Sequence, residues 1–351
     1  MLSLKLLPAV VSRYHRVLTP RRAANAARVV LSYLLSRLAG RDVRWGRPFV
    51  LMVEPTNICN LKCPLCPSGN GDMTRPKGKM DVDAFRRIFE QLADDLLLLM
   101  LWNQGEPFIN RHLNDMVRLA KSRNVPTITS TNAHYIRTHQ DAEDIVGSGL
   151  DEIIISLDGA NAETYAKYRV GGSFDRVLEG IRHLTAAKRR LEADHPVVHL
   201  QFIIMKHNES EVEDIRRLAA KLDVDRLTLK TAQVYTQQEA RDYLPSDESQ
   251  SRYRYDTEAL TTKAKVVNTC RHLWYSTVVN WDGSVSPCCF DKDLRYGLGN
   301  ALNGRPFDDI WTGESYTSFR NAILKDRASV PMCRNCSEGL KGQFYDIETV
   351  R

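Results

Sequence analysis

Residues 54–67 read Glu-Pro-Thr-Asn-Ile-Cys-Asn-Leu-Lys-Cys-Pro-Leu-Cys-Pro and directly follow an apolar run, residues 49–53. Three cysteines, Cys59, Cys63 and Cys66, therefore stand in a C-x3-C-x2-C spacing after a predicted strand. Three thiolates on one short loop can ligate one metal centre, but a tetrahedral zinc ion or a cubane iron–sulfur cluster has four positions to fill. The spacing predicts either a fourth protein ligand from elsewhere or a position left open to a molecule that is not protein. Ligand type alone leaves zinc open as an alternative.

Composition points to a cytoplasmic, metal-binding chain. With 351 residues and 43% hydrophobic content, the chain can bury one large core or two domains. Its eight cysteines are too few for a secreted disulfide scaffold of this length and suit metal ligands in a reducing compartment. No run of 18 apolar residues exists, so no membrane span is expected. Residues 1–11 contain a proline and lack a cleavage-site pattern, so we expect no signal peptide.

Positive charge is concentrated in residues 1–47. This segment holds ten basic residues and one acidic residue, a net charge of +9, whereas the whole chain carries +6. Thr19-Pro20 predicts a helix start and Gly40 a stop, with a helix running to about Leu38. We expect one apolar stripe along it, flanked by Arg28 and Arg37 and made of Val29, Val30, Tyr33, Leu34 and Leu38.

Two interpretations of this basic amphipathic helix stand side by side. It lies on an anionic surface, as a peripheral contact with the inner face of the membrane, or it packs against the body with its arginines in water. Nucleic-acid binding is not expected, because few aromatic residues are interleaved with the basic ones.

Between residues 48 and 235, apolar strands alternate with amphipathic helices. We expect strands near 49–54, 96–102, 125–130, 152–157, 198–204 and 226–230, and helices near 81–94, 111–123, 140–148, 174–192 and 209–222. Alternation of this kind predicts parallel β-structure, and the length of each unit matches that of an eight-fold barrel. The predicted fold is α/β, an open, partial (β/α)6 barrel. Chemistry is expected at the C-terminal ends of its strands.

Polar motifs fall at these strand ends. Asn103 to Pro107 follows the second strand, Ser130 to Asn132 the third, and Ile155 to Gly159 the fourth. Ser156 and Asp158 should share one face, because strand side chains alternate with period two. Arg169 follows in Tyr-Arg-Val-Gly-Gly. Taken alone, each motif is also compatible with an ordinary turn or a surface ion pair.

A second group of cysteines lies near the C-terminus. Residues 236–269 are polar and aperiodic, and we expect them to form a linker that also covers the site. Cys270, Cys288, Cys333 and Cys336 then follow in a C-x17-C-x44-C-x2-C spacing, with a hairpin signal at Asp282-Gly283. Four thiolates fill either a [4Fe–4S] cluster or a structural zinc site. Residues 270–345 are expected to form a small cysteine-rich domain of hairpin and helix.

Together these motifs resemble the radical S-adenosylmethionine (SAM) enzymes, followed by an auxiliary-cluster domain of the SPASM/Twitch type. The resemblance covers residues 49 to about 340. It implies a [4Fe–4S] cluster on the three loop cysteines, with SAM on the fourth iron, and one auxiliary [4Fe–4S] cluster on the four later cysteines. The residues that it implies for SAM binding are Gln104, Gly105, Glu106, Pro107, Thr131, Asn132, Ser156, Asp158 and Arg169. Gln104 stands where the family's motif has a glycine.

The resemblance also implies a reaction. An external one-electron donor such as flavodoxin or ferredoxin reduces the cluster, SAM is cleaved, and the resulting 5′-deoxyadenosyl radical removes a hydrogen atom from the substrate. We expect an oxidation or rearrangement of a small or conjugated metabolite, such as a sugar, cyclitol or lipid-linked intermediate. A peptide maturase is the alternative within the class. A non-catalytic, zinc-stabilised, membrane-associated binding protein is the alternative of another class.

Two residues are candidates for a catalytic base. Cys289 follows the predicted ligand Cys288, at a position where sulfatase-maturing relatives carry an acidic residue, and Asp291 lies two positions further on. A thiol acts as a proton acceptor only if its pKa is depressed. The other interpretation of Cys289 is a simple buried cysteine.

Overall fold

Six parallel strands form the centre of the molecule. In the computed structural model, which describes residues 17–255, 259–338 and 345–350, they lie side by side in the order of the sequence. Each pairs in parallel with the next. They are β1 (Val50–Val53), β2 (Leu98–Met100), β3 (Thr127–Thr131), β4 (Glu152–Ser156), β5 (Val197–Ile204) and β6 (Arg226–Thr231). All six predicted strands are confirmed, with ends shifted by a few residues.

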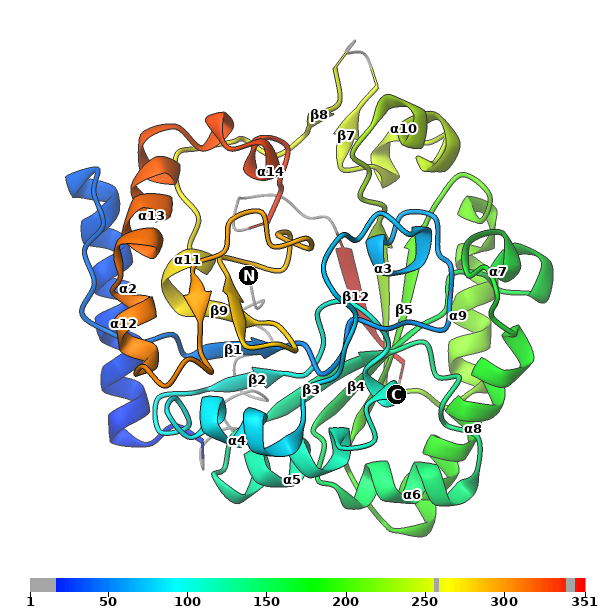
Figure 1. The fold of residues 1–351 in the computed structure, drawn as a ribbon. Helices are drawn as coiled ribbons and strands as arrows, with labels where there is room; N and C mark the ends of the chain where they lie inside the picture. Colours follow the sequence, from blue (N-terminus) through cyan, green and yellow to red (C-terminus); the bar gives the residue numbers. More distant parts are fainter. Residues whose placement is uncertain (1–16, 256–258, 339–344, 351) are drawn as a thin grey trace.

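Helices cover the outer side of this curved sheet (Figure 1). The predicted ones are confirmed as α4 (Val82–Phe89), α5 (Leu113–Ser122), α6 (His139–Gly147), α8 (Phe174–Arg190) and α9 (Val212–Lys221). Asp81 caps α4 by accepting a hydrogen bond from the backbone N–H of Ala84, and the apolar side of α4 is buried in the core. Shorter helices that the sequence analysis did not predict are α3 (Pro67–Asn70), η2 (Pro107–Ile109), α7 (Ala162–Tyr168) and η3 (Glu209–Glu211). The partial (β/α)6 barrel is confirmed.

The sheet continues beyond the barrel at both edges. The predicted hairpin forms from β9 (Ser276–Val279) and β10 (Ser284–Ser286), and β10 also pairs with β11 (Gly299–Asn300). β9 lies parallel to β1, so the hairpin extends the barrel sheet. At the other edge β12 (Tyr345–Thr349) pairs antiparallel with β6. Backbone groups that two edge strands of the barrel would otherwise leave unpaired are thereby hydrogen-bonded.

The remaining C-terminal elements surround the hairpin. They are α11 (His272–Tyr275), α12 (Phe307–Trp311), α13 (Glu314–Asp326), η5 (Arg327–Ser329) and α14 (Pro331–Arg334). Residues 236–269, expected to be a linker, hold α10 (Gln237–Tyr243), η4 (Glu248–Gln250), β7 (Tyr253–Arg254) and β8 (Thr261–Thr262). Buried Arg252 fixes this segment by donating to the Thr231 hydroxyl and to the Ser337 hydroxyl. The predicted division at residues 236–269 thus separates segments that share one sheet.

The N-terminal helix α2 (Pro20–Ala39) begins and ends as predicted. Thr19 is its N-cap, and Gly40 ends it with φ 64°. Figure 1 shows α2 at one edge of the molecule, beside α12 and α13. The expected single apolar stripe is wrong, because Val29 faces inwards while Val30, Leu34 and Leu38 are exposed. The signal-peptide prediction concerns residues 1–11, which lie outside the described residues, and no helix of the described part has the length and apolar character needed to cross a bilayer.

Candidate active site

The cysteine loop follows β1 and folds back on itself. The backbone N–H of Cys66 donates to the carbonyl of Cys63 over 3.1 Å, and the N–H of Leu61 donates to the sulfur of Cys59 over 3.4 Å. Gly69 of α3 lies against this turn, and a Cβ there would stand 2.6 Å from the backbone nitrogen of Cys63. The loop is compact because position 69 carries no side chain.

Side chains from other strand ends reach each of the three loop thiols. The amide of Asn132, after β3, lies 3.9 Å from the sulfur of Cys59, and the guanidinium of Arg169 lies 3.8 Å from that of Cys63. The side-chain oxygen of Gln104, after β2, lies 3.9 Å from the sulfur of Cys66. The structure thus brings three predicted SAM-binding residues next to the three predicted cluster ligands.

Glu106 is buried at the centre of a hydrogen-bond network. Its carboxylate accepts bonds from the hydroxyl of Thr131 and the backbone N–H of Asn132, both at 2.7 Å, and from the N–H of Phe108 at 3.1 Å. Burial raises the pKa of Glu106 to about 7, although these donors act in the opposite direction. Glu106 therefore joins the ends of β2 and β3, and Pro107 begins η2 directly after it.

Gly105 and Gln104 fit this loop to the cysteine loop. Gly105 has φ 77°, and a Cβ there would stand 2.6 Å from the carbonyl oxygen of Thr56. Only glycine allows so close an approach of the two backbones. Gln104, the departure from the family's glycine, accepts a hydrogen bond from the Ser68 hydroxyl at 3.2 Å.

Asp158 and Arg169 form a buried ion pair. The Nε of Arg169 donates to the Asp158 carboxylate over 2.6 Å, and the other carboxylate oxygen accepts from the backbone N–H of Ile203 at 2.8 Å. This pair orients the guanidinium beside Cys63. Ser156 is buried at the end of β4, on the strand that leads to Asp158.

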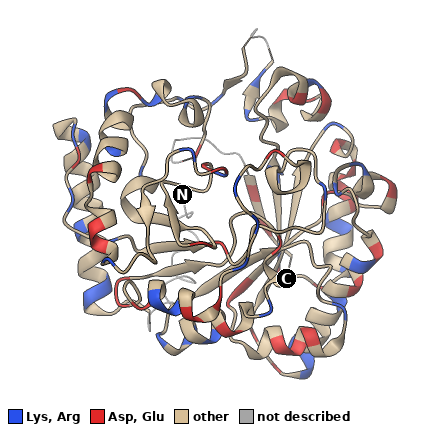
Figure 2. Cartoon of the chain, viewed as in Figure 1, with Lys and Arg blue, Asp and Glu red and all other residues tan. Residues whose placement is uncertain are grey.

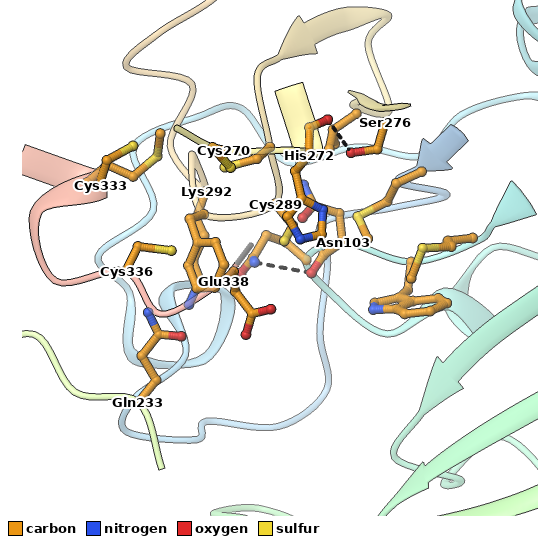
Figure 3. Close-up of a pocket in the computed structure, with 18 of the residues that line it drawn as sticks. Asn103, Gln233, Cys270, His272, Ser276, Cys289, Lys292, Cys333, Cys336 and Glu338 are labelled. Carbon is orange, nitrogen blue, oxygen red and sulfur yellow. Dashed lines mark hydrogen bonds between the residues drawn. The ribbon is translucent and has the colours of Figure 1, made fainter. Parts of the chain in front are cut away.

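The second group of cysteines lines a cavity of about 660 Å³ together with Cys66. Figure 3 shows Cys270, Cys289, Cys333 and Cys336 around it, and Cys288 lines it as well. These thiols come from the segment before α11, the segment after β10 and the region of α14. Three stretches of chain therefore converge on one wall of the cavity.

Arg327 holds two of these stretches together, and the sequence analysis missed it. Its buried guanidinium donates to the carbonyls of Thr269, Cys333 and Cys336 over 2.7, 3.3 and 2.9 Å. In the sequence it is one arginine among many, six residues before Cys333. Its short distance from a cysteine pair was the only signal that could have marked it.

The two candidate bases occupy different environments. Cys289 lines the cavity near Lys230 and Lys292, and burial raises its pKa to about 11. Asp291 is not among the residues that line the cavity. Its carboxylate instead accepts from the backbone N–H groups of Arg295 and Tyr296, at 2.7 and 2.9 Å. Asp291 thus shapes the loop after the cysteines.

Titratable groups also line the cavity. Lys292, His272 and Glu338 line it, as does Lys230 at the end of β6 (Figure 3 labels the first three). The ammonium of Lys292 lies 5.2 Å from the centre of the Tyr235 ring. Burial lowers the pKa of Lys230. No sequence pattern marks Lys292, His272 and Glu338, because only tertiary contacts bring them together.

The thiols suit a group larger than a single metal ion. Burial raises the pKa of Cys59 and of Cys333 to about 12, so a thiolate at either place needs positive charge beside it, as iron supplies. Across the described ranges, no three His, Cys, Asp or Glu side chains converge on a point where one metal ion could bind. A polynuclear iron–sulfur cluster held by separated thiolates fits this arrangement better than zinc.

Comparisons with known proteins match this geometry. Residues 53–219 match the radical SAM superfamily, and residues 270–337 match the SPASM iron–sulfur cluster-binding domain. A tungsten-containing aldehyde ferredoxin oxidoreductase cofactor-modifying protein of Pyrococcus furiosus is 24% identical over 82% of this chain and 86% of its own. The PqqA peptide cyclase of Bradyrhizobium diazoefficiens is 26% identical over 54% of this chain and 48% of its own, so the match spans about half of that relative.

A solved structure shares the fold. The crystal structure of Streptococcus suis SuiB bound to precursor peptide SuiA has a TM-score of 0.60 and 15% identity, over 90% of this chain and 75% of that one. Radical SAM proteins bind a [4Fe–4S] cluster and SAM, and SPASM domains bind auxiliary iron–sulfur clusters. The non-catalytic zinc protein is thereby set aside. The chain is an enzyme of the radical SAM superfamily with a C-terminal SPASM domain.

Proposed function

We propose that this enzyme modifies a peptide by hydrogen-atom abstraction inside the cavity between its two groups of cysteines. Two of the similar proteins act on or bind peptides, as their names state, the PqqA peptide cyclase and SuiB with its precursor peptide. Another relative, matched over 82% of this chain, is a cofactor-modifying protein by its name. The comparisons therefore favour the peptide alternative over the expected sugar, cyclitol or lipid-linked metabolite.

One observation carries the proposal. A single cavity of about 660 Å³ is lined at one end by Cys66, Gln104 and Arg169, and at the other by the C-terminal cysteines. A substrate in it would touch both sites at once. Much of the wall is apolar and comes from β1, β2 and β9, which suits peptide side chains.

The residues have separate tasks in this proposal. Cys59, Cys63 and Cys66 hold the SAM-binding [4Fe–4S] cluster, and Cys270, Cys288, Cys333 and Cys336 hold the auxiliary cluster. When bound, these groups and SAM supply the radical and redox chemistry. The protein itself binds these groups and the substrate and orients them. Arg169, fixed by Asp158, would bind the SAM carboxylate. Gln104 and Asn132 lie beside the loop thiols, and Glu106 keeps their two loops in place.

The remaining residues that the resemblance implies complete the SAM site. Gly105 permits the close backbone approach, while Pro107, Thr131 and Ser156 shape the strand ends. We no longer propose Cys289 or Asp291 as the base, because burial raises the pKa of the Cys289 thiol and backbone N–H groups hold the Asp291 carboxylate. A one-electron donor such as flavodoxin or ferredoxin remains part of the proposal.

Cavity charge indicates an anionic group on the substrate. Lys230 and Lys292 both line it together with one carboxylate, that of Glu338, and in the described part of the chain neither ammonium lies within 4.0 Å of a carboxylate. Two cations in a partly dry cavity attract a carboxylate more strongly than they would in water. We therefore expect a peptide with an acidic side chain, or a free C-terminal carboxylate, close to the modified residue.

The test uses anaerobically purified, cluster-reconstituted enzyme with SAM and a chemical reductant. Peptides encoded by short reading frames next to the gene are compared with versions in which Asp and Glu become Asn and Gln, and with a panel of sugars and cyclitols. We expect 5′-deoxyadenosine to rise at least ten-fold with one acidic peptide and the mass of that peptide to change. The proposal is wrong if a sugar or cyclitol gives this stimulation and no peptide does.

A further inference from the structure

Helix α2 packs against the body through its polar side. The buried guanidinium of Arg22 donates to the carbonyls of Ala93, Arg123 and Asn124. The hydroxyl of Ser36 accepts from the indole N–H of Trp274 at 3.1 Å. Hydrogen bonds therefore hold much of this helix in place, whereas surface helices usually pack through an apolar face.

Further polar contacts on the same face repeat this arrangement. The hydroxyl of Ser32 accepts from the backbone N–H of Trp45 at 2.8 Å. The Asn25 side chain exchanges two hydrogen bonds with the backbone of Arg47. Residues 43–47 are thus bound along α2, and the inward side of the helix is already satisfied.

Val29 is buried among the inward polar residues, and most other apolar residues of α2 lie on the opposite side, in solvent. We call Ala27, Val30, Leu31, Leu34 and Leu38 the outer stripe. Ala27, Leu31, Leu34 and Leu38 are four, three and four residues apart, which places them on one helix face. Val30 is 52% exposed, Leu31 46%, Leu34 45% and Leu38 85%. A continuous apolar stripe of this kind on the surface of a folded protein marks an interaction site.

Arginines flank the outer stripe without acidic neighbours on the helix. Arg28, Arg37 and Arg41 are exposed, and none of them pairs with a carboxylate among the described residues. The guanidinium of Arg37 lies 5.7 Å from the centre of the Tyr33 ring. Residues 17–41 contain no Asp or Glu. Figure 2 shows basic positions along this helix.

We propose that the outer stripe of α2 docks the enzyme onto an anionic lipid bilayer. Leu31, Leu34 and Leu38 enter the boundary between headgroups and acyl chains, and the flanking arginines meet lipid phosphates. This surface faces away from the site, since the opposite face of α2 is the one bound to the body. Docking through this surface would therefore place the enzyme at the bilayer without altering its chemistry.

Charge decides between a bilayer and a second copy of this chain. If two outer stripes met across a two-fold axis, each would bring three arginines and no helix carboxylate to the contact. Like charges at such a contact are repulsive. An anionic bilayer supplies both the apolar phase and the negative charge, so it satisfies both features of the surface.

The test measures co-flotation of the full-length, reconstituted enzyme with vesicles. Vesicles of phosphatidylcholine alone are compared with vesicles that contain one quarter phosphatidylglycerol. The stripe variant is L31N/L34N/L38N, and the charge variant is R28Q/R37Q/R41Q. The matched control, L191N/V267N/I347N, removes three exposed apolar side chains on other elements. Thermal unfolding verifies that all variants keep their fold.

We expect the wild type and the control to bind the anionic vesicles and to bind neutral ones much less. The stripe variant should lose at least ten-fold in affinity. The charge variant should lose about a hundred-fold, because each of the three basic residues near an anionic surface contributes about five-fold. High salt should lower the affinity of the wild type for anionic vesicles towards that of the charge variant.

Three outcomes would overturn the proposal. In the first, the wild type fails to float with anionic vesicles. In the second, the stripe variant binds as well as the wild type, which would assign binding to another part of the chain. In the third, sedimentation velocity shows a dimer that the stripe variant abolishes while vesicle binding is unchanged, which would make a second copy the occupant.

Discussion

The two cysteine sites are built in opposite ways. Cys59, Cys63 and Cys66 lie within eight residues on one loop, and this loop is closed by its own backbone and by Gly69. The C-terminal cysteines come from separate stretches of chain, two of which buried Arg327 joins. The first site therefore depends on local structure and the second on tertiary contacts. Changes to either site should show this difference.

The largest effect is expected from Cys63→Ala. Losing one of three ligands should abolish SAM cleavage to background and remove about half of the iron, while the auxiliary site keeps its own. Detection of 5′-deoxyadenosine and iron analysis of the anaerobically reconstituted protein measure both. Cys289→Ala, a cysteine that we do not propose as a ligand, serves as control and should keep full iron. Unchanged SAM cleavage in Cys63→Ala would refute the assignment of the loop.

Arg327→Met should destabilise the C-terminal site selectively. The change leaves several buried carbonyl groups without their donor, which costs about 3–5 kcal/mol of unfolding free energy. Auxiliary iron should fall while iron on the cysteine loop stays. Urea unfolding and iron analysis measure the change, and Arg118→Met, in a surface ion pair, is the control at under about 1 kcal/mol. Equal loss of iron from both sites would contradict the conclusion that only the C-terminal site depends on Arg327.

The raised pKa of Glu106 predicts that the stability of the protein without SAM depends on pH. Its folded pKa, about 7, lies above the ordinary value of 4.5, so its contribution is fully present below pH 4.5 and is lost as the pH rises towards 7. The loss amounts to roughly 3 kcal/mol. In Glu106→Gln, which cannot ionise, this part of the slope should disappear. Unfolding in urea between pH 4.5 and 8 tests it, and parallel curves for both proteins would exclude Glu106 as the source.

The smallest effect is expected from Gln104→Gly, which restores the glycine of the family's motif. It removes the side-chain hydrogen bonds with the Ser68 hydroxyl and the Asn103 carbonyl and should cost about 1–2 kcal/mol. SAM cleavage should stay within a few-fold of wild type, because backbone and Glu106 are kept. A loss of more than a hundred-fold would show that the Gln104 side chain itself takes part in SAM binding.

Features encoded locally could be predicted from the sequence. The strands, their helices and the Thr19 and Gly40 ends of α2 follow from periodicity, caps and turn residues, which act over a few positions. The cysteine loop follows from spacing on one loop. The same holds for the hairpin at Gly283, which has φ 83°.

What depends on distant contacts could not be predicted. The pattern of α2 left open whether its apolar residues face the body or an outside surface. Ser36 and Arg22 bind Trp274 and Asn124, and the outer stripe therefore faces solvent. No sequence pattern marks Arg327 or Lys292, because their roles come from contacts with residues that are distant in the sequence. Asp291 was placed by its nearness to Cys288, yet backbone N–H groups hold it.

Strand β1 has neighbours from opposite ends of the polypeptide, β2 on one side and β9 on the other. The cysteine-rich segment is therefore not an interchangeable module. Grafting it onto a foreign barrel would require a first strand whose free edge matches β9 residue for residue. Separate expression of the two halves would leave each with an exposed edge strand, which could pair with other polypeptide chains and aggregate. Inheritance of the two halves as a unit is the simplest consequence of this shared strand.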